Sequence, residues 1–75
     1  MDAVTTCTFK PKAGDQEKIT EEKVPRALVY FAMLIRQKHP QVQGKDLTYF
    51  LDGLWIRRPQ VDTIVPTGAN LWVQE

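Results

Sequence analysis

The scarcity of cross-linking residues is what most limits the folds open to this chain. Cys7 is the only cysteine, so no internal disulfide can form, and His39 is the only histidine, so no Cys/His cage can close around zinc. With 75 residues, the chain is near the lower size at which an unassisted core is stable. We therefore expect one domain, residues 1–75, held together by good packing or by self-association.

The composition is that of a globular protein. Apolar residues make up 43% of the chain, and the net charge of +1 lacks the basic excess typical of a dedicated nucleic-acid-binding protein. The segment from Met1 to Val4 has neither the basic nor the apolar region of a secretory signal. The longest apolar run, residues 27–35, is too short to cross a membrane. These features predict a cytoplasmic protein with no membrane partner.

The N-terminal segment has the pattern of a β-strand. Residues 3–9 are rich in β-branched side chains, and a period of two places Ala3, Thr5, Cys7 and Phe9 on one face. A proline, a glycine and several charges then predict a loop over residues 10–18. Residues 16–23 are polar and define no element.

A central helix follows. Pro25 is tolerated in a first helical turn, Glu21 and Glu22 suit the positive end of the helix dipole, and Pro40 stops the helix. The apolar residues at helical spacing, which predict the buried stripe, are Val24, Leu28, Phe31, Ala32 and Ile35, widened by Ala27 and Leu34.

The segment 46–56 is open to two interpretations. Asp46 suits the start of a helix over residues 46–53, with Leu47, Phe50, Leu51 and Leu54 on one face. The pair Asp52-Gly53 between apolar runs is instead the strongest short-range signal for a β-hairpin. The flanking residues do not alternate apolar with polar, so we favour the helix.

The C-terminal segment predicts a hairpin. Residues 62–65 and 70–73 flank a turn at Pro66-Thr67-Gly68-Ala69. The expected order is β-α-α-β-β. This is an α+β domain with its helices packed on one face of a small antiparallel sheet.

No residue pattern supports catalysis, a metal or a cofactor. The chain has no serine, Cys7 has only the distant His39 as a base, and the adjacent carboxylates of Glu21 and Glu22 point in different directions on a helix. The four glycines show no phosphate-binding spacing. We expect no enzyme, no bound metal, no cofactor and no small-molecule substrate.

A winged helix-turn-helix is the alternative function. Two helices and a C-terminal hairpin outline a DNA-binding transcription or recombination factor, in which residues 46–53 enter the major groove. Lys45, Arg57 and Arg58 are the candidate phosphate contacts. The groove helix would expose only Thr48, Tyr49 and Asp52, and few of these side chains read bases.

The far side of the central helix favours protein binding. A solvated helix usually carries Glu, Lys or Gln there, but this one carries apolar residues rimmed by arginines, which is typical of protein interfaces. We call this set the outer helix face; its members are Arg26, Val29, Tyr30, Met33, Arg36 and Gln37. The other interpretation is that the rest of the chain folds over this side and buries it.

The leading hypothesis is a small non-enzymatic regulator or inhibitor. It would bind another protein, or itself as a homodimer, through the outer helix face. Its compactness and lack of catalytic groups resemble the small regulators encoded by phages and mobile elements.

Overall fold

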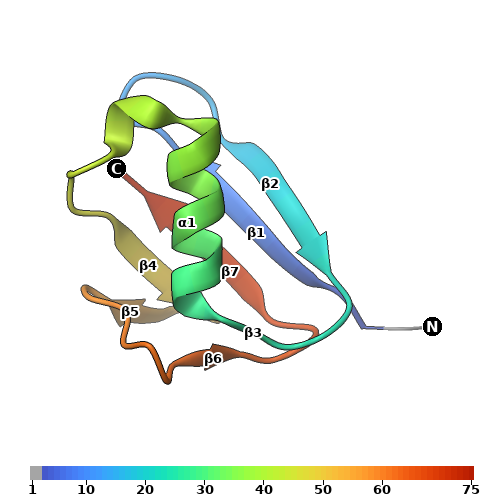
Figure 1. Ribbon diagram of the computed structural model, residues 1–75. Coiled ribbons are helices and arrows are strands. Elements are labelled where there is room, and N and C mark those ends of the chain that lie inside the picture. The colour runs from blue at the N-terminus through green and yellow to red at the C-terminus, as the bar shows by residue number, and fades with distance from the viewer. Residues whose placement is uncertain (1–2) are drawn as a thin grey trace.

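The computed structural model describes residues 3–75 as one helix packed on a mixed β-sheet (Figure 1). The fold is α+β, as the sequence predicts. The elements in chain order are β1 (Thr5–Lys10), β2 (Glu17–Glu22), β3 (Arg26–Ala27), α1 (Leu28–Lys38), a 3-10 turn η1 (Pro40–Val42), β4 (Thr48–Leu51), β5 (Leu54–Ile56), β6 (Ile64–Val65) and β7 (Asn70–Gln74). Among these residues no helix is long and apolar enough to cross a membrane.

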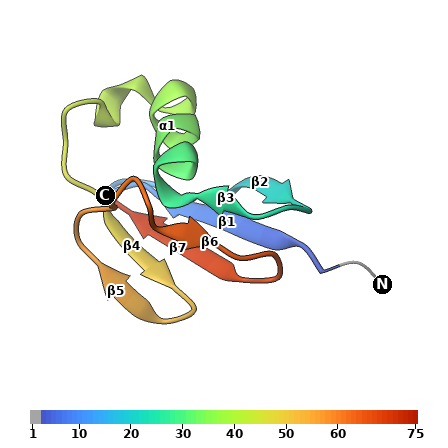
Figure 2. The same cartoon turned by 60° about the horizontal axis from the view of Figure 1, so that its bottom comes forward.

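The main sheet has five strands in the order β2-β1-β7-β4-β5. β1 and β7 form a parallel central pair, and the other neighbours are antiparallel. The helix crosses one face of this sheet, and the opposite face carries no further layer within residues 3–75 (Figure 2). A fold of this kind does not by itself indicate a function.

A second, two-stranded sheet fixes the start of the helix. β3 pairs with β6 antiparallel, and the Leu28 N–H donates to the Thr63 carbonyl over 2.8 Å. This bond satisfies a backbone donor of the first helical turn, which has no partner inside the helix.

The core lies between α1 and the sheet. Leu28, Phe31, Ala32 and Ile35 are buried on the sheet side of α1, which confirms most of the stripe that the helical spacing predicts. The sheet contributes the alternate residues of its strands, which are Thr5, Cys7 and Phe9 of β1, Tyr49 of β4, and Leu71 and Val73 of β7.

Residues 48–56 form a hairpin, so the helix favoured over residues 46–53 is wrong. β4 pairs with β5 across the turn Asp52-Gly53, where both residues have positive φ, 50° and 85°. Those angles suit the two-residue turn that Asp-Gly favours in hairpins. β4 also pairs with β7, and this long-range pairing outweighs the local helical pattern. Because these residues form strands, the winged helix-turn-helix interpretation has no recognition helix.

The helix begins later than the sequence predicts. Pro25 precedes β3 rather than lying in the first helical turn, and Val24 is exposed at 49% rather than buried. Glu21 and Glu22 belong to β2, so they do not face the helix dipole. Residues 16–23, which defined no element, are largely this edge strand, and the predicted loop shortens to residues 11–16. The helix ends before Pro40, as expected.

The predicted C-terminal hairpin is also wrong. β6 and β7 lie close to the expected segments, but β6 pairs with β3 while β7 inserts between β1 and β4. The sheet is consequently mixed rather than antiparallel. Ala3, expected on the buried face, precedes β1 and is exposed.

Thr5 links the two ends of the chain through its buried hydroxyl. Its Oγ1 donates to the Pro66 carbonyl over 2.7 Å and accepts from the Gly68 N–H over 3.1 Å. Thr5→Val keeps the shape but leaves the Gly68 N–H without its partner, while the Pro66 carbonyl keeps only its bond from the Ala69 N–H. We therefore expect a loss of about 1–3 kcal/mol in the free energy of unfolding. Urea unfolding followed by circular dichroism measures it. Thr6→Val, on the solvent-facing side of the same strand, should change stability by less than about 0.5 kcal/mol; equal effects would contradict the role of the Thr5 hydroxyl.

Candidate functional site

The sole cysteine and the sole histidine are both engaged in the structure of the domain. Cys7 is buried on the helix side of β1, and this burial raises the pKa of its thiol to about 12. His39 lies at the C-terminal end of α1, where its ring packs on Phe9 with centroids 4.9 Å apart and its Nε2 lies 3.4 Å from a Glu17 oxygen. A thiol held neutral is a weak nucleophile, so this arrangement does not activate Cys7.

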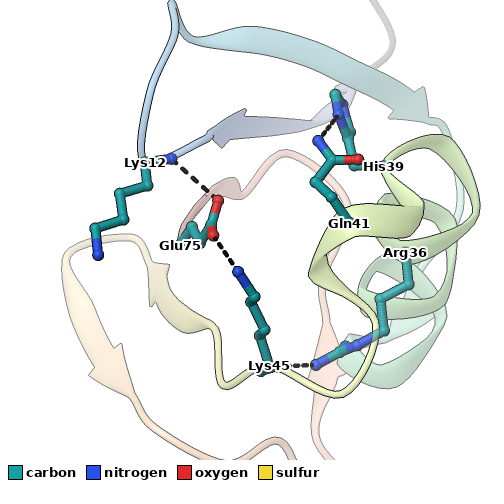
Figure 3. A network of polar contacts seen from close by, with 6 residues as sticks. All are labelled: Lys12, Arg36, His39, Gln41, Lys45 and Glu75. Carbon is teal, nitrogen blue, oxygen red and sulfur yellow. Dashed lines mark hydrogen bonds and ion pairs between the residues drawn. The ribbon is translucent and has the colours of Figure 1, made fainter.

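A polar network joins the C-terminal strand to the segment after the helix (Figure 3). The Glu75 carboxylate accepts from the Lys12 backbone N–H over 3.1 Å and lies 3.5 Å from Lys45 Nζ. The hydrogen bond from Lys12 is the main cause that lowers the pKa of Glu75, and Lys45 adds to it. Arg36 donates to the Lys45 carbonyl over 2.9 Å. The network thus joins the β1–β2 loop, the segment after η1 and the C-terminal residue. Elsewhere in residues 3–75, no three His, Cys, Asp or Glu side chains gather as metal ligands would.

The candidate phosphate contacts separate in the structure. Arg57 and Arg58 together line a polar cleft of about 380 Å³, whose other lining residues are Asp46, Leu47 and Thr48. Lys45 does not line this cleft, because its ammonium group is directed to Glu75.

The centre of the outer helix face is not covered by the rest of the described chain, whereas Tyr30 at its edge is partly buried against the core. Met33, at its centre, is exposed at 48%, so the interpretation in which the chain folds over this side is wrong. An open groove of about 540 Å³ runs beside Met33. The groove is lined by Val29, Ala32, Met33, Arg36, Gln37, Gln43 and Pro59, and so brings together four of the six predicted interface residues.

The other two predicted residues lie toward β2. The Tyr30 hydroxyl donates to Glu22 over 2.8 Å, and this hydrogen bond raises the pKa of Tyr30. The Arg26 guanidinium lies 5.2 Å from the Tyr30 ring centroid and 3.5 Å from the Glu22 carboxylate. Tyr30 also lines a second groove, of about 370 Å³, with Gln37 and residues of β2. Arg26 belongs to β3, before α1 begins, so its predicted place on the helix is wrong. The outer helix face therefore has an adaptable centre at Met33 and a fixed polar edge at Tyr30, which Arg26 of β3 adjoins.

The sheet carries a second exposed surface, which the sequence reasoning missed. We call the side of the five-stranded sheet that faces away from α1 the open face. Trp72 of β7, Phe50 of β4 and Trp55 of β5 are successive cross-strand neighbours on it, and we call them the aromatic row. Trp55 is exposed at 59%, and the Arg57 guanidinium lies 5.7 Å from its ring centroid.

The signal for this row was present in the sequence. In the hairpin interpretation of Asp52-Gly53, Phe50 and Trp55 are paired across the strands and share a face. The position of Trp72 beside Phe50 depends on the insertion of β7 between β1 and β4, for which no local pattern exists.

The chain matches no protein-family model, no curated protein and no solved structure. The outer helix face and the open face are therefore its candidate binding surfaces.

Proposed function

We propose that this chain is a small non-enzymatic regulator or inhibitor that binds another protein through the outer helix face. The observation that carries the proposal is Met33, half-exposed beside an apolar groove that Arg36 borders. Met adapts its flexible side chain to a partner, and Arg is enriched at the residues that dominate binding energy. The thiol of Cys7 is buried and its pKa is raised, which supports a non-enzymatic role.

The groove suits a protein partner better than a small molecule. It is open along the side of α1, whereas small-molecule sites enclose most of their ligand. Arg36 is held in place by its bond to the Lys45 carbonyl, so the polar border of the groove is set before a partner arrives. Such preorganisation reduces the entropy lost on binding. With one cysteine and no disulfide, the cytoplasm is the compartment we propose.

Met33→Glu tests the proposal. The variant should stay folded by circular dichroism because the position is exposed, yet lose its partner in a pull-down from cells that express the protein. Once the partner is purified, we expect affinity to fall by at least about thirtyfold, since a charge at the centre of an interface costs about 2 kcal/mol or more.

Val24→Glu is the matched control. Val24 is exposed to the same degree, 49%, but does not line the groove. It should bind the partner like the wild type. A folded Met33→Glu variant that captures the same partner with unchanged affinity would refute the assignment of this face.

A further inference from the structure

The open face has its charges arranged in rows on either side of the aromatic row. Side chains two positions apart along a strand share a face and are separated by about 7 Å. The pairing register then gives two polar rows parallel to the aromatic one. One row is Glu21, Thr6, Asn70 and Asp52; the other is Lys10, Gln74 and Thr48, continued by Arg57.

The two polar rows carry opposite charge. In the first row, both ends are carboxylates, Glu21 on β2 and Asp52 at the β4–β5 turn. In the second row, both ends are cations, Lys10 on β1 and Arg57 just after β5. The open face is therefore acidic along one side and basic along the other, with aromatic rings between. Within one copy, Glu21 pairs with Lys18 at the β2 end of the aromatic row, and Lys10 donates to the Gly14 carbonyl, so both side chains would have to exchange these partners in the dimer.

We propose that the open face binds a second copy of this chain, with a two-fold axis that runs along the aromatic row. Rotation by 180° about that axis stacks each aromatic residue on its own equivalent. The same rotation places the acidic row of one copy over the basic row of the other, with Lys10 facing Thr6 and Thr48 facing Asp52. Glu21 then lies one strand away from Lys10, and Asp52 one strand away from Arg57, an offset of about 5 Å that long side chains span. A two-fold interface must be complementary to itself. This charge pattern meets that condition, because the acidic row of each copy faces the basic row of the other.

A dimer of ordinary stability would need the whole open face. The domain exposes 4959 Å² in total, and a stable dimer hides about 800 Å² on each partner, roughly a sixth of that surface. A sixth corresponds to one entire side of a body with extents of 35 × 25 × 21 Å. The aromatic row alone is too small, so the polar rows must contribute. Two packed sheets would also share a core about 10 Å thick, as in β-sandwiches.

Charge argues against a single-stranded nucleic acid as the occupant. Aromatic rows on sheets do stack bases, but such sites lie in positively charged grooves. Here the acidic row flanks the rings on one side, and Asp46 lines the cleft that Arg57 and Arg58 share. Lys18, at the β2 end of the aromatic row, is already paired with Glu21.

Sedimentation equilibrium from about 1 µM to about 1 mM tests the dimer, with an expected dissociation constant inside this range. Trp55→Ala should weaken dimerisation about a hundredfold, because each dimer loses two exposed tryptophans that stack on each other at the β5 end of the aromatic row. Trp55 is outside the core, so the variant should keep the wild-type circular dichroism spectrum. Monomeric wild-type protein over the whole range would overturn the proposal.

A charge swap tests the geometry of the axis. Lys10→Glu alone and Glu21→Lys alone should each weaken dimerisation about tenfold, since each creates like-charge contacts twice per dimer. The double variant should recover to within about threefold of the wild type, because the exchanged charges again face each other. Failure to recover would overturn the two-fold arrangement.

Two controls separate this surface from the outer helix face. Lys38→Glu reverses a charge on the helix side of the domain, where Lys38 lies 3.5 Å from Glu17, and should leave the dimer unchanged. Met33→Glu should also leave the dimer unchanged while it abolishes partner binding. If Met33→Glu dissociates the dimer, the interface lies on the helix face and the present proposal fails. Binding of a dT12 oligonucleotide that Trp55→Ala abolishes, without self-association, would assign the face to nucleic acid instead.

Discussion

Replacing Phe31 with alanine should remove most of the stability of the fold. Phe31 is fully buried on the sheet side of α1, in the middle of the core. Truncation of a buried phenylalanine costs about 3–5 kcal/mol, through lost burial and the cavity left behind. A domain of this size has about 4–11 kcal/mol in all. We expect the melting temperature, followed by circular dichroism, to fall by roughly 15–30 °C.

Met33→Ala is the matched control for this substitution. Met33 is on the same helix, two residues further along, and is half-exposed. Its truncation removes few core contacts, so the free energy of unfolding should change by less than about 1 kcal/mol. If the two variants were equally stable, the burial pattern of α1 would be wrong.

The helix and the first strand were predictable because their signals are local. The spacing of Leu28, Phe31, Ala32 and Ile35 follows the helical period, and all four are buried. The alternation of Thr5, Cys7 and Phe9 likewise identifies the inner face of β1. Periodicity is a property of neighbouring residues, so one sequence suffices to read it.

The hairpin at residues 48–56 was misassigned because its apolar residues are contiguous. Leu47, Phe50, Leu51 and Leu54 fit a helical stripe, but in the structure Tyr49 faces the core while Phe50 faces the other way. Both faces of β4 carry apolar side chains, which removes the alternation that would have revealed a strand. The helix was therefore favoured wrongly because the open face of β4 also carries an apolar side chain, that of Phe50.

The sheet order could not be predicted, because it depends on contacts between the two ends of the chain. β1 pairs with β7 across about 60 residues, in parallel. Parallel pairs need a long crossover and leave no turn signal between the strands. Of the candidate surfaces, the outer helix face follows from one helix and was predicted. The aromatic row was not predicted, because it depends both on the β4–β5 hairpin and on the position of β7 between β1 and β4.

Cys7 should react with thiol reagents at least about a thousandfold more slowly in the native protein than in the unfolded chain. The thiolate is the reactive form, and burial raises the pKa of Cys7 to about 12 from an ordinary value near 9. At pH 8 the native thiol is therefore almost entirely protonated, whereas about a tenth of unfolded thiols are ionised. Labelling with iodoacetamide at pH 8, quantified by mass spectrometry, gives the two rates, with the protein in 8 M urea as the reference.

Two routes of reaction exist in the native state, and both are slow. Reaction in place is limited by the small thiolate fraction and by the absence of solvent contact at Cys7, which is 0% exposed. Reaction through opening is limited by the free energy needed to detach β1 from its neighbours β2 and β7. Because β1 lies inside the sheet, this opening requires most of the fold to unfold. Phe31→Ala serves as a control, because a destabilised fold should label faster if opening is the route. Native labelling within tenfold of the unfolded rate would show that β1 is accessible, and the buried, inert Cys7 that supports a non-enzymatic function would have to be abandoned.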